Sequence, residues 1–280
     1  MNRSPARLNL EHLKKQAKEL IRLYRRQAPE AYARFRQALP AAAGRSDVQI
    51  AALDLRLHDA QSCVARDLGF ASWPDLRRYV EAQLPPGKSK ADRVRRWLQL
   101  VYAADVAGTS DRANPRVAMR MLREDPGLFG DDPYLACAIG DESTIQRIAT
   151  SDPAWVNRPG GPLKLPPLVA VTHSSLLQIP EFQARLHRCA RLLLAAGADP
   201  DQHISSRWPP GSLDAPDDSN PLSALYGAAG QNHDLGLTRL LLEAGANPND
   251  NESLYHSLEG SVTTGVLLEH GARIAGTNAM

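Results

Sequence analysis

Apolar residues recur at three- and four-residue spacing through most of the chain, the pattern typical of amphipathic helices. In residues 8–27 the apolar positions on one side are Leu10, Leu13, Ala17, Leu20, Ile21 and Tyr24. The same spacing, together with proline and serine at expected helix starts, predicts helices over residues 29–39, 57–69, 73–84, 91–107 and 115–124. Residues 40–47 are predicted to be a loop. The pattern therefore predicts an all-α protein.

An apolar motif that ends in a glycine turn occurs three times in the sequence. Residues 192–201 read Leu-Leu-Leu-Ala-Ala-Gly-Ala-Asp-Pro-Asp, residues 240–249 read Leu-Leu-Leu-Glu-Ala-Gly-Ala-Asn-Pro-Asn, and residues 267–272 repeat the motif in shortened form. Each copy predicts the end of a helix, a glycine in the left-handed conformation and a polar turn. The three glycines are Gly197, Gly245 and Gly271.

A second signal opens a short helix before each of these ends. The sequences are Pro-Tyr-Leu-Ala from Pro133, Pro-Leu-Val-Ala from Pro167, Pro-Leu-Ser-Ala from Pro221 and Ser-Leu-Tyr-His from Ser253. Their leucines are separated by 33, 54 and 32 residues, and two of these steps match the period of about 33 residues found in ankyrin repeats. Over residues 131–280 the chain thus resembles the ankyrin-repeat family, whose unit opens T-P-L-H-x-A and closes L-L-x-x-G-A-x-x-N. The resemblance implies an α-solenoid of stacked helix-turn-helix repeats with a concave binding face.

The predicted organisation has four parts. Residues 1–84 form a basic helical module, 85–90 a linker, and 91–130 a helix pair that caps the stack. Residues 131–280 hold about four ankyrin-like repeats, with an insertion at 202–219 that accounts for most of the 54-residue step. The module resembles one found ahead of ankyrin repeats in some bacterial proteins, and this implies no activity. No polar helix follows the last repeat, which predicts an uncapped end and leaves open a truncated chain.

The charge is divided unevenly along the chain. Residues 1–97 carry 20 basic and 10 acidic side chains, whereas residues 98–280 carry 13 basic and 21 acidic ones. Three interpretations of the basic module stay open: a solvated helical face, docking against the acidic repeats, and binding of nucleic acid or an anionic surface.

The sequence gives little sign of catalysis or of a metal site. It lacks a G-x-S-x-G elbow, a phosphate-binding G-x-x-x-x-G-K-[ST] loop and an H-E-x-x-H pair. His173, His187 and Cys189 lack the close pairing of zinc ligands, and Asp214, Asp217 and Asp218 lack the spacing of a calcium loop. Asp59, beside His58, is expected to cap a helix. We therefore expect a protein that is not an enzyme and has neither metal nor cofactor.

Three cysteines at wide spacing argue against a disulfide framework, and no apolar segment is long enough for a membrane span or a signal peptide. These observations favour a cytoplasmic protein, while export as an effector stays open. The excess of arginine over lysine suggests a bacterial source.

Binding of another protein is the function that the sequence favours. Insertions in repeat arrays usually lie on the binding face, so Trp208 is expected either to anchor a partner or to fold back onto the array. The candidate partner-binding residues are Arg207, Trp208, His203, Tyr226 and Arg158. The alternative is a nucleic-acid-associated protein that uses the basic module. The partner's identity and the oligomeric state stay open.

Overall fold

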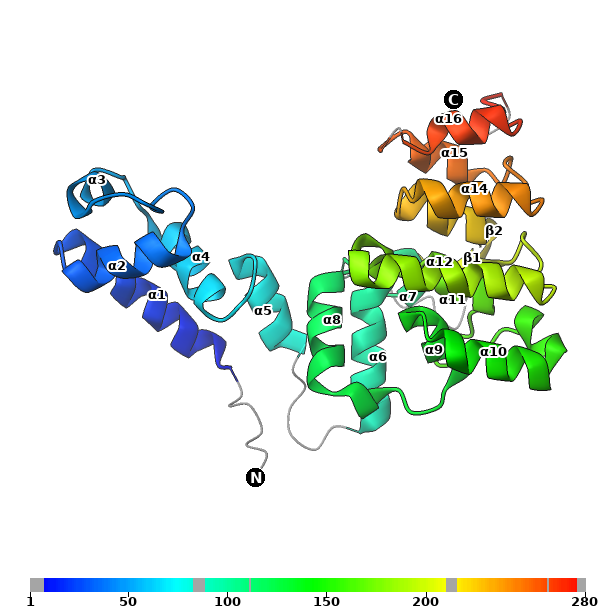
Figure 1. Cartoon of the computed structure of the whole chain (residues 1–280), viewed down its shortest axis with the longest axis horizontal. Coiled ribbons are helices and arrows are strands. Elements are labelled where there is room, and N and C mark those ends of the chain that lie inside the picture. The colour runs from blue at the N-terminus through cyan, green and yellow to red at the C-terminus, as the bar shows by residue number, and fades with distance from the viewer. Residues whose placement is uncertain (1–7, 83–88, 111, 210–215, 261, 276–280) are drawn as a thin grey trace. The chain divides into compact units, whose positions relative to one another are not determined.

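The computed structural model describes residues 8–82, 89–110, 112–209, 216–260 and 262–275. The described chain is mostly helical, as the sequence predicted (Figure 1). It divides into two compact units, Met1–Gly87 and Lys88–Met280.

Five helices form the first unit. They are α1 (Leu10–Arg25), α2 (Pro29–Ala38), α3 (Asp47–Ala51), α4 (Leu57–Asp67) and α5 (Trp73–Ala82). Helix α3 was not predicted; it begins at Asp47, where Ser46 and Gln49 exchange hydrogen bonds in a capping box. Asp59 was predicted as the cap of α4, but it lies inside the first turn and its carboxylate accepts a hydrogen bond from the Arg56 backbone N–H at 2.8 Å.

Aromatic rings and small residues fill the core of the first unit. The Tyr24 ring meets the Tyr32 and Phe35 rings edge-on, with centroids 6.0 and 5.6 Å apart. The Tyr24 hydroxyl donates to the Ile50 carbonyl at 3.1 Å, which ties α1 to α3. Helix α4 packs against α1, α2 and α5, so it lies at the centre of the module.

The second unit begins with a helix pair that lacks the repeat motifs. It comprises α6 (Lys90–Val101) and α8 (Pro115–Glu124), with the short helix α7 (Ala104–Ala107) between them. One helix was predicted over residues 91–107, but Tyr102 is extended, with φ −103° and ψ 147°, and separates α6 from α7. Its hydroxyl donates to the Ala170 carbonyl at 2.8 Å, so this side chain is held in the interior.

Four further helix pairs follow in order. Their first members are α9 (Pro133–Ile139), α11 (Pro167–Thr172), α13 (Ala224–Tyr226) with the π-helix η4 (Gly227–Gln231), and α15 (Glu252–Ser257). Their second members are α10 (Glu142–Ser151), α12 (Pro180–Ala195), α14 (Leu235–Glu243) and α16 (Thr264–Glu269). Short 3₁₀ helices lie at η1 (Pro126–Leu128), η2 (Pro153–Asn157) and η3 (Ser175–Gln178). First helices contact neighbouring first helices and second helices contact neighbouring second helices, which gives two stacked rows (Figure 1).

The three glycine turns have the predicted conformation. Gly197, Gly245 and Gly271 have φ of 92°, 99° and 92°, in the left-handed region that favours glycine. In each turn the N–H of the following alanine donates to the carbonyl of the buried leucine five residues earlier, at 2.9, 3.0 and 2.9 Å. This bond is the 6→1 bond of a Schellman motif. Those leucines, Leu193, Leu241 and Leu267, are 0% exposed.

Polar side chains join each turn to the next one along the stack. The side-chain oxygen of Asn157 accepts a hydrogen bond from Asp199 N at 2.8 Å, and the Asp201 carboxylate accepts one from Asn247 N at 2.7 Å. The side-chain oxygen of Asn249 likewise accepts from Arg273 N at 2.8 Å. One hydrogen bond therefore recurs at three successive junctions, which fixes the register of the pairs.

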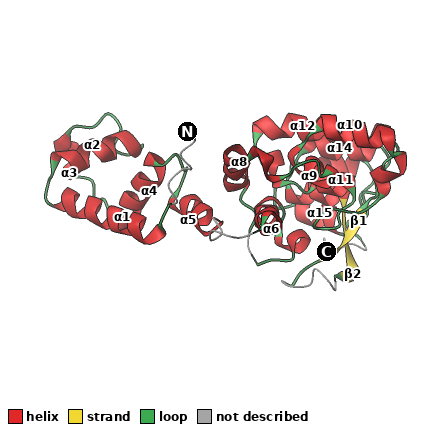
Figure 2. Cartoon of the chain, turned by 90° about the horizontal axis from the view of Figure 1, so that it is seen from below, coloured by secondary structure: helices red, strands yellow, loops and turns green. Residues whose placement is uncertain are grey.

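One β-hairpin departs from the all-α prediction. Strands β1 (His203–Ser206) and β2 (Asp217–Ser223) pair antiparallel. Strand β1 lies within the insertion predicted at 202–219, whereas β2 continues beyond it through Pro221–Ser223, where the sequence predicted the opening of a helix. Figure 2 shows the first-row helices α9, α11 and α15 between the second-row helices and the two strands. Among the described residues, every helix is too short or too polar to cross a membrane.

Candidate functional site

The hairpin of the second unit holds three of the five sequence-predicted binding residues: His203 on β1, with Arg207 and Trp208 directly after it. His203 pairs with Ser223 and Ile204 with Leu222, and the register shifts between Ser205 and Ser206. Strand β2 then runs directly into α13, where the Ser223 hydroxyl caps the helix by accepting from Tyr226 N at 2.8 Å. The hairpin is therefore continuous with the third repeat-like pair.

Arg207 anchors the hairpin from the inside. Its side chain is only 6% exposed, and its guanidinium donates to the Val106 carbonyl at 2.7 Å and to the Leu163 carbonyl at 2.5 Å. Its backbone N–H donates to the Asp105 carbonyl at 2.7 Å. Burial lowers the pKa of the Arg207 guanidinium. Arg207 was a candidate for partner contact, but it is buried and two of its guanidinium N–H groups bond to the protein's own backbone, which favours a structural place.

Trp208 follows directly and lies at the surface. It is 53% exposed, the most exposed of the large aromatic side chains in the described chain. It lines an open cleft of about 410 Å³. Of the two alternatives left by the sequence, the described conformation leaves the indole accessible rather than folded back into the core.

The cleft lies where the first helices of three successive pairs end. His173 and Ser175 come from the segment after α11, and Tyr226, Gln231 and His233 from α13, η4 and the residues that follow. The end of α15 adds His256 and Glu259, and the α6–α7 junction adds Asp105. A short polar cleft with an aromatic rim is thus assembled from four distant parts of one unit.

Asp105 is the hub of the polar network in this cleft. Its carboxylate accepts a hydrogen bond from the Tyr226 hydroxyl at 3.1 Å and from the Gln231 amide nitrogen at 3.1 and 3.2 Å. Burial, with the charge of Asp105, raises the pKa of Tyr226 far above its ordinary value. The phenol therefore stays protonated and donates to the carboxylate.

His173 extends the network into the interior. The ring is 1% exposed, with Nε2 2.8 Å from the Ser223 carbonyl and Nδ1 2.9 Å from the Gln231 amide oxygen. Both of these oxygens accept hydrogen bonds, so each contact requires a proton on the ring nitrogen that faces it. Burial lowers the pKa of His173, and the Ser223 carbonyl and the charge of Asp105 oppose that shift in part.

Two buried polar atoms of the cleft lining have no hydrogen-bond partner among the described residues. They are the Ser175 hydroxyl, on a residue that is 4% exposed, and Nδ1 of His233. Buried polar groups are normally paired, because leaving one unpaired costs about 1–3 kcal/mol. Both atoms are therefore positions at which a ligand could supply the missing partner.

The structure brings together only part of the sequence-predicted set. Trp208 and Tyr226 line the cleft, with Arg207 buried next to Trp208 in the chain. His203 is exposed on β1, with Nδ1 3.1 Å from the Asp201 carbonyl. Arg158 pairs with the Asp152 carboxylate at 2.8 Å. Neither His203 nor Arg158 lines the cleft.

Sequence reasoning missed Asp105, Ser175, Gln231 and His233. Asp105 lies 126 residues before the glutamine that it binds, and no local motif marks either residue. His173, His187 and Cys189, weighed as metal ligands, do not meet: His187 bonds to Asp234 at 2.8 Å, and Cys189 is a buried free thiol. Within the described chain, no cluster of three histidine, cysteine or acidic side chains could hold a metal ion.

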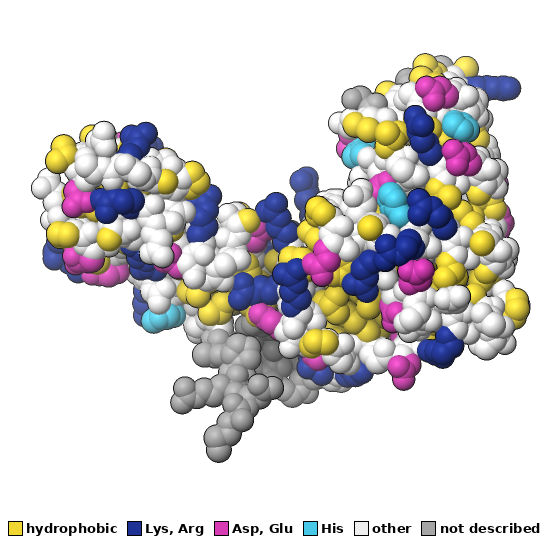
Figure 3. All heavy atoms as spheres, in the orientation of Figure 1, with side chains coloured by type: hydrophobic (Ala, Val, Ile, Leu, Met, Phe, Trp, Pro, Cys, Tyr) yellow, Lys and Arg dark blue, Asp and Glu magenta, His cyan; other side chains and the backbone are white. Residues whose placement is uncertain are grey.

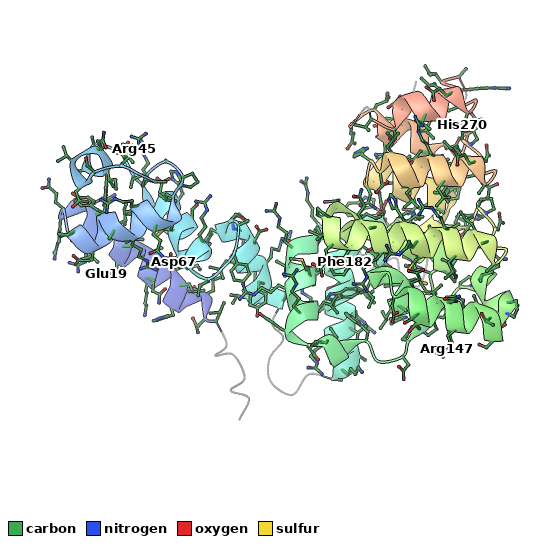
Figure 4. The ribbon with its side chains drawn as sticks, viewed as in Figure 1. Glu19, Arg45, Asp67, Arg147, Phe182 and His270 are labelled. Carbon is green, nitrogen blue, oxygen red and sulfur yellow. The ribbon has the colours of Figure 1, made fainter. Side chains whose placement is uncertain are left out.

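The basic module shows a dispersed charge. On the face seen in Figure 3, lysine and arginine side chains are spread over the helices of both units rather than gathered into one patch. Several are paired within the module. For example, the Arg34 guanidinium donates at 2.6 Å to the carboxylate of Asp67, which Figure 4 labels on α4.

Comparisons with protein-family models, with curated proteins and with solved structures find no match for this sequence.

Proposed function

We propose that this chain is a non-enzymatic scaffold that binds a partner protein through the repeat array of its second unit, with Trp208 at the centre of the contact. The proposal treats the four helix pairs from α9 to α16 as ankyrin-type repeats. Their recurrent glycine turns and the recurrent hydrogen bond between turns support that assignment. Stacked repeats of this kind present an extended surface suited to protein recognition.

The observation that carries the proposal is the contrast between two adjacent residues. Arg207 is buried and bonded to two backbone carbonyls, while Trp208 beside it is 53% exposed. An exposed tryptophan on an anchored backbone loses little conformational freedom when it is buried by a partner. Tryptophan is also enriched among the residues that dominate binding energies.

Binding fits the cleft better than catalysis does. The nitrogens of His173 already face Ser223 and Gln231, and the Asp105 carboxylate accepts from Tyr226 and Gln231. A general base needs a hydrogen bond to the proton that it removes, and these bonds to the protein leave the two groups in a structural arrangement. The proposal therefore assigns no covalent or proton-transfer step to this site.

We also propose a cytoplasmic location. Cys63, Cys137 and Cys189 are free and buried. Burial raises the pKa of Cys63 and of Cys189 to about 12 in each case, so these thiols stay protonated at neutral pH. Buried, unpaired thiols suit a reducing compartment.

A pair of substitutions tests the function. Trp208→Ala should abolish capture of a partner from extracts of the native host, whereas Trp208→Phe, which keeps an aromatic ring, should retain much of it. Both variants should melt within about 2 °C of the parent, because a half-exposed side chain adds little stability. Each captured protein is then purified and titrated against the parent and both variants.

Equal affinity of the purified partner for the parent and for Trp208→Ala would overturn the proposal. A large fall in melting temperature of Trp208→Ala would do the same, because it would make the indole a structural residue.

A further inference from the structure

The cleft beside Trp208 has a chemistry that points to one kind of side chain. Two carboxylates, Asp105 and Glu259, line it, and no lysine or arginine is among the described residues of its lining. Glu259 has 70% of its side chain exposed, and its carboxylate lies 3.5 Å from Nδ1 of His256. A positively charged group entering the cleft therefore meets two carboxylates, and no lysine or arginine belongs to its described lining.

The surrounding sequence strengthens this electrostatic preference. From Ala198 to the end, the chain contains three arginines, no lysine and 11 acidic residues. The guanidinium of Arg207, one of the three, points to the Val106 and Leu163 carbonyls. An acidic surface of this kind raises the encounter rate of a basic partner and orients its approach.

The acceptors are arranged around the cleft rather than at one point. The Asp105 carboxylate has about four acceptor positions, and two donors, Tyr226 and Gln231, bind it from within the protein. The unpartnered Ser175 hydroxyl and His233 Nδ1 lie in the same lining. A guanidinium carries five N–H donors and no acceptor, so it can bond to several such atoms at once.

Trp208 supplies an aromatic surface for a bound cation. Its indole is exposed on the cleft, and a planar guanidinium stacks on an aromatic face with a favourable cation–π energy. The backbone bond from Arg207 N to the Asp105 carbonyl, at 2.7 Å, holds the ring and the carboxylate in one frame. The backbone segments that carry the ring and the carboxylate are thus joined directly.

We propose that this cleft binds an arginine side chain from a basic segment of the partner protein, with the guanidinium between the Asp105 carboxylate, the Ser175 hydroxyl and the Trp208 indole. This inference rests on the proposed protein-binding function and names the chemistry of the partner. Glu259, in the same lining, contributes long-range attraction.

The test uses the full-length chain and three labelled pentapeptides, each with one central residue flanked by glycine and serine. The central residue is arginine, lysine or citrulline, the last being the uncharged isostere of arginine. Fluorescence anisotropy should give a dissociation constant below about 1 mM for the arginine peptide. The lysine peptide should bind more weakly, and the citrulline peptide should show no detectable binding. Contact with Trp208 should also shift tryptophan emission, since Trp97 and Trp155 are only 0% and 3% exposed and the half-buried Trp73 belongs to the other unit.

Substitutions in the cleft separate recognition from folding. Ser175→Ala removes a hydroxyl without a partner among the described residues, so it should leave the melting temperature unchanged or raise it. The same substitution should weaken binding of the arginine peptide about fivefold. Glu259→Gln should weaken the peptide by a similar factor. Glu243→Gln, at the end of α14 and outside the cleft lining, removes the same charge and serves as the matched control with unchanged affinity.

Equal binding of the arginine and citrulline peptides would overturn the inference. So would an absence of arginine-peptide binding, or loss of affinity in Glu243→Gln equal to that in Glu259→Gln. If the arginine peptide shows no binding while a purified partner still loses affinity for Trp208→Ala, the inference fails and the proposed function stands. If the purified partner binds Trp208→Ala and the parent equally, the proposed function itself fails.

Discussion

At the scale of single residues, Gly227 is the most tightly constrained position near the cleft. Its φ of −58° and ψ of −41° are helical, so any residue could adopt the backbone conformation. A Cβ atom here, however, would lie 2.3 Å from Cδ2 of the His173 ring. That ring cannot move aside cheaply, because both of its nitrogens have partners within 2.9 Å. The glycine is therefore required by packing and not by backbone strain.

Gly227→Ala should lower the free energy of unfolding by about 1–3 kcal/mol, the usual result of overfilling a packed interior. Urea denaturation followed by circular dichroism measures the loss. The matched control is Gly265→Ala in α16, where an added Cβ meets no atom within 4 Å. That substitution should stabilise by up to about 1 kcal/mol, because alanine is the better helix former. Equal effects of the two substitutions would contradict the packing argument.

At the scale of elements, junctions between helix pairs combine apolar burial with a small number of polar bonds. The buried leucines of the glycine turns supply stability without direction, since hydrophobic burial does not depend on orientation. The bonds from Asn157, Asp201 and Asn249 to the next turn supply the register. Each junction thus separates the source of stability from the source of alignment.

Asp201→Ala tests that division. The substitution removes the acceptor for Asn247 N and should lower the free energy of unfolding by about 1–2 kcal/mol in urea titrations. Asp201→Asn keeps an oxygen at the same place and should recover most of the loss. A loss as large for asparagine as for alanine would mean that charge, and not the hydrogen bond, matters at this junction.

Asp234 connects two second-row helices in a way that depends on pH. Its carboxylate is 5% exposed, and it accepts from Leu237 N at 2.9 Å, from Gln183 at 2.9 Å and from His187 at 2.8 Å. Burial raises the pKa of this carboxyl, but the hydrogen bonds, led by that from His187, outweigh burial and leave the pKa below its ordinary value. The ionised form is thus favoured in the folded state.

A lowered carboxyl pKa stabilises the fold above the unfolded pKa, near 4, and that stabilisation is lost as pH falls through the lower folded pKa. Asp234→Asn keeps the capping oxygen but cannot ionise. At pH 5 the variant should therefore be less stable than the parent by about 1–2 kcal/mol. The difference should shrink as the pH is lowered toward 3 in parallel denaturation series. A difference that stays constant with pH would show that the charge of Asp234 contributes nothing.

At the scale of the whole molecule, local sequence signals and tertiary placement contributed different information. The turn at Gly197 was predictable because a buried leucine, a glycine and a polar residue lie within six positions. The break at Tyr102 was not, because the residue is extended to reach the Ala170 carbonyl, 68 residues away.

The hairpin and the cleft show the same division. The insertion at 202–219 was recognised by its length, but no alternating apolar pattern predicted that β1 and β2 would pair. Trp208 was recognised by its chemistry, whereas Asp105 became part of the same site only through the stacking of the pairs. The burial of Arg207 was likewise not predictable from the sequence, because its two carbonyl partners lie 101 and 44 residues away in the chain.

The division into two compact units gives a last prediction. All residues that line the cleft belong to Lys88–Met280, as do all four stacked helix pairs. A protein comprising residues 88–280 should therefore unfold cooperatively on heating and bind the arginine pentapeptide within about twofold of the full chain, by the same anisotropy titration. Residues 1–87 alone, which carry a net positive charge and no part of the cleft, should not bind it. A folded 88–280 protein with at least tenfold weaker binding would mean that the basic module takes part in recognition, and the site would then have to be redrawn to include it.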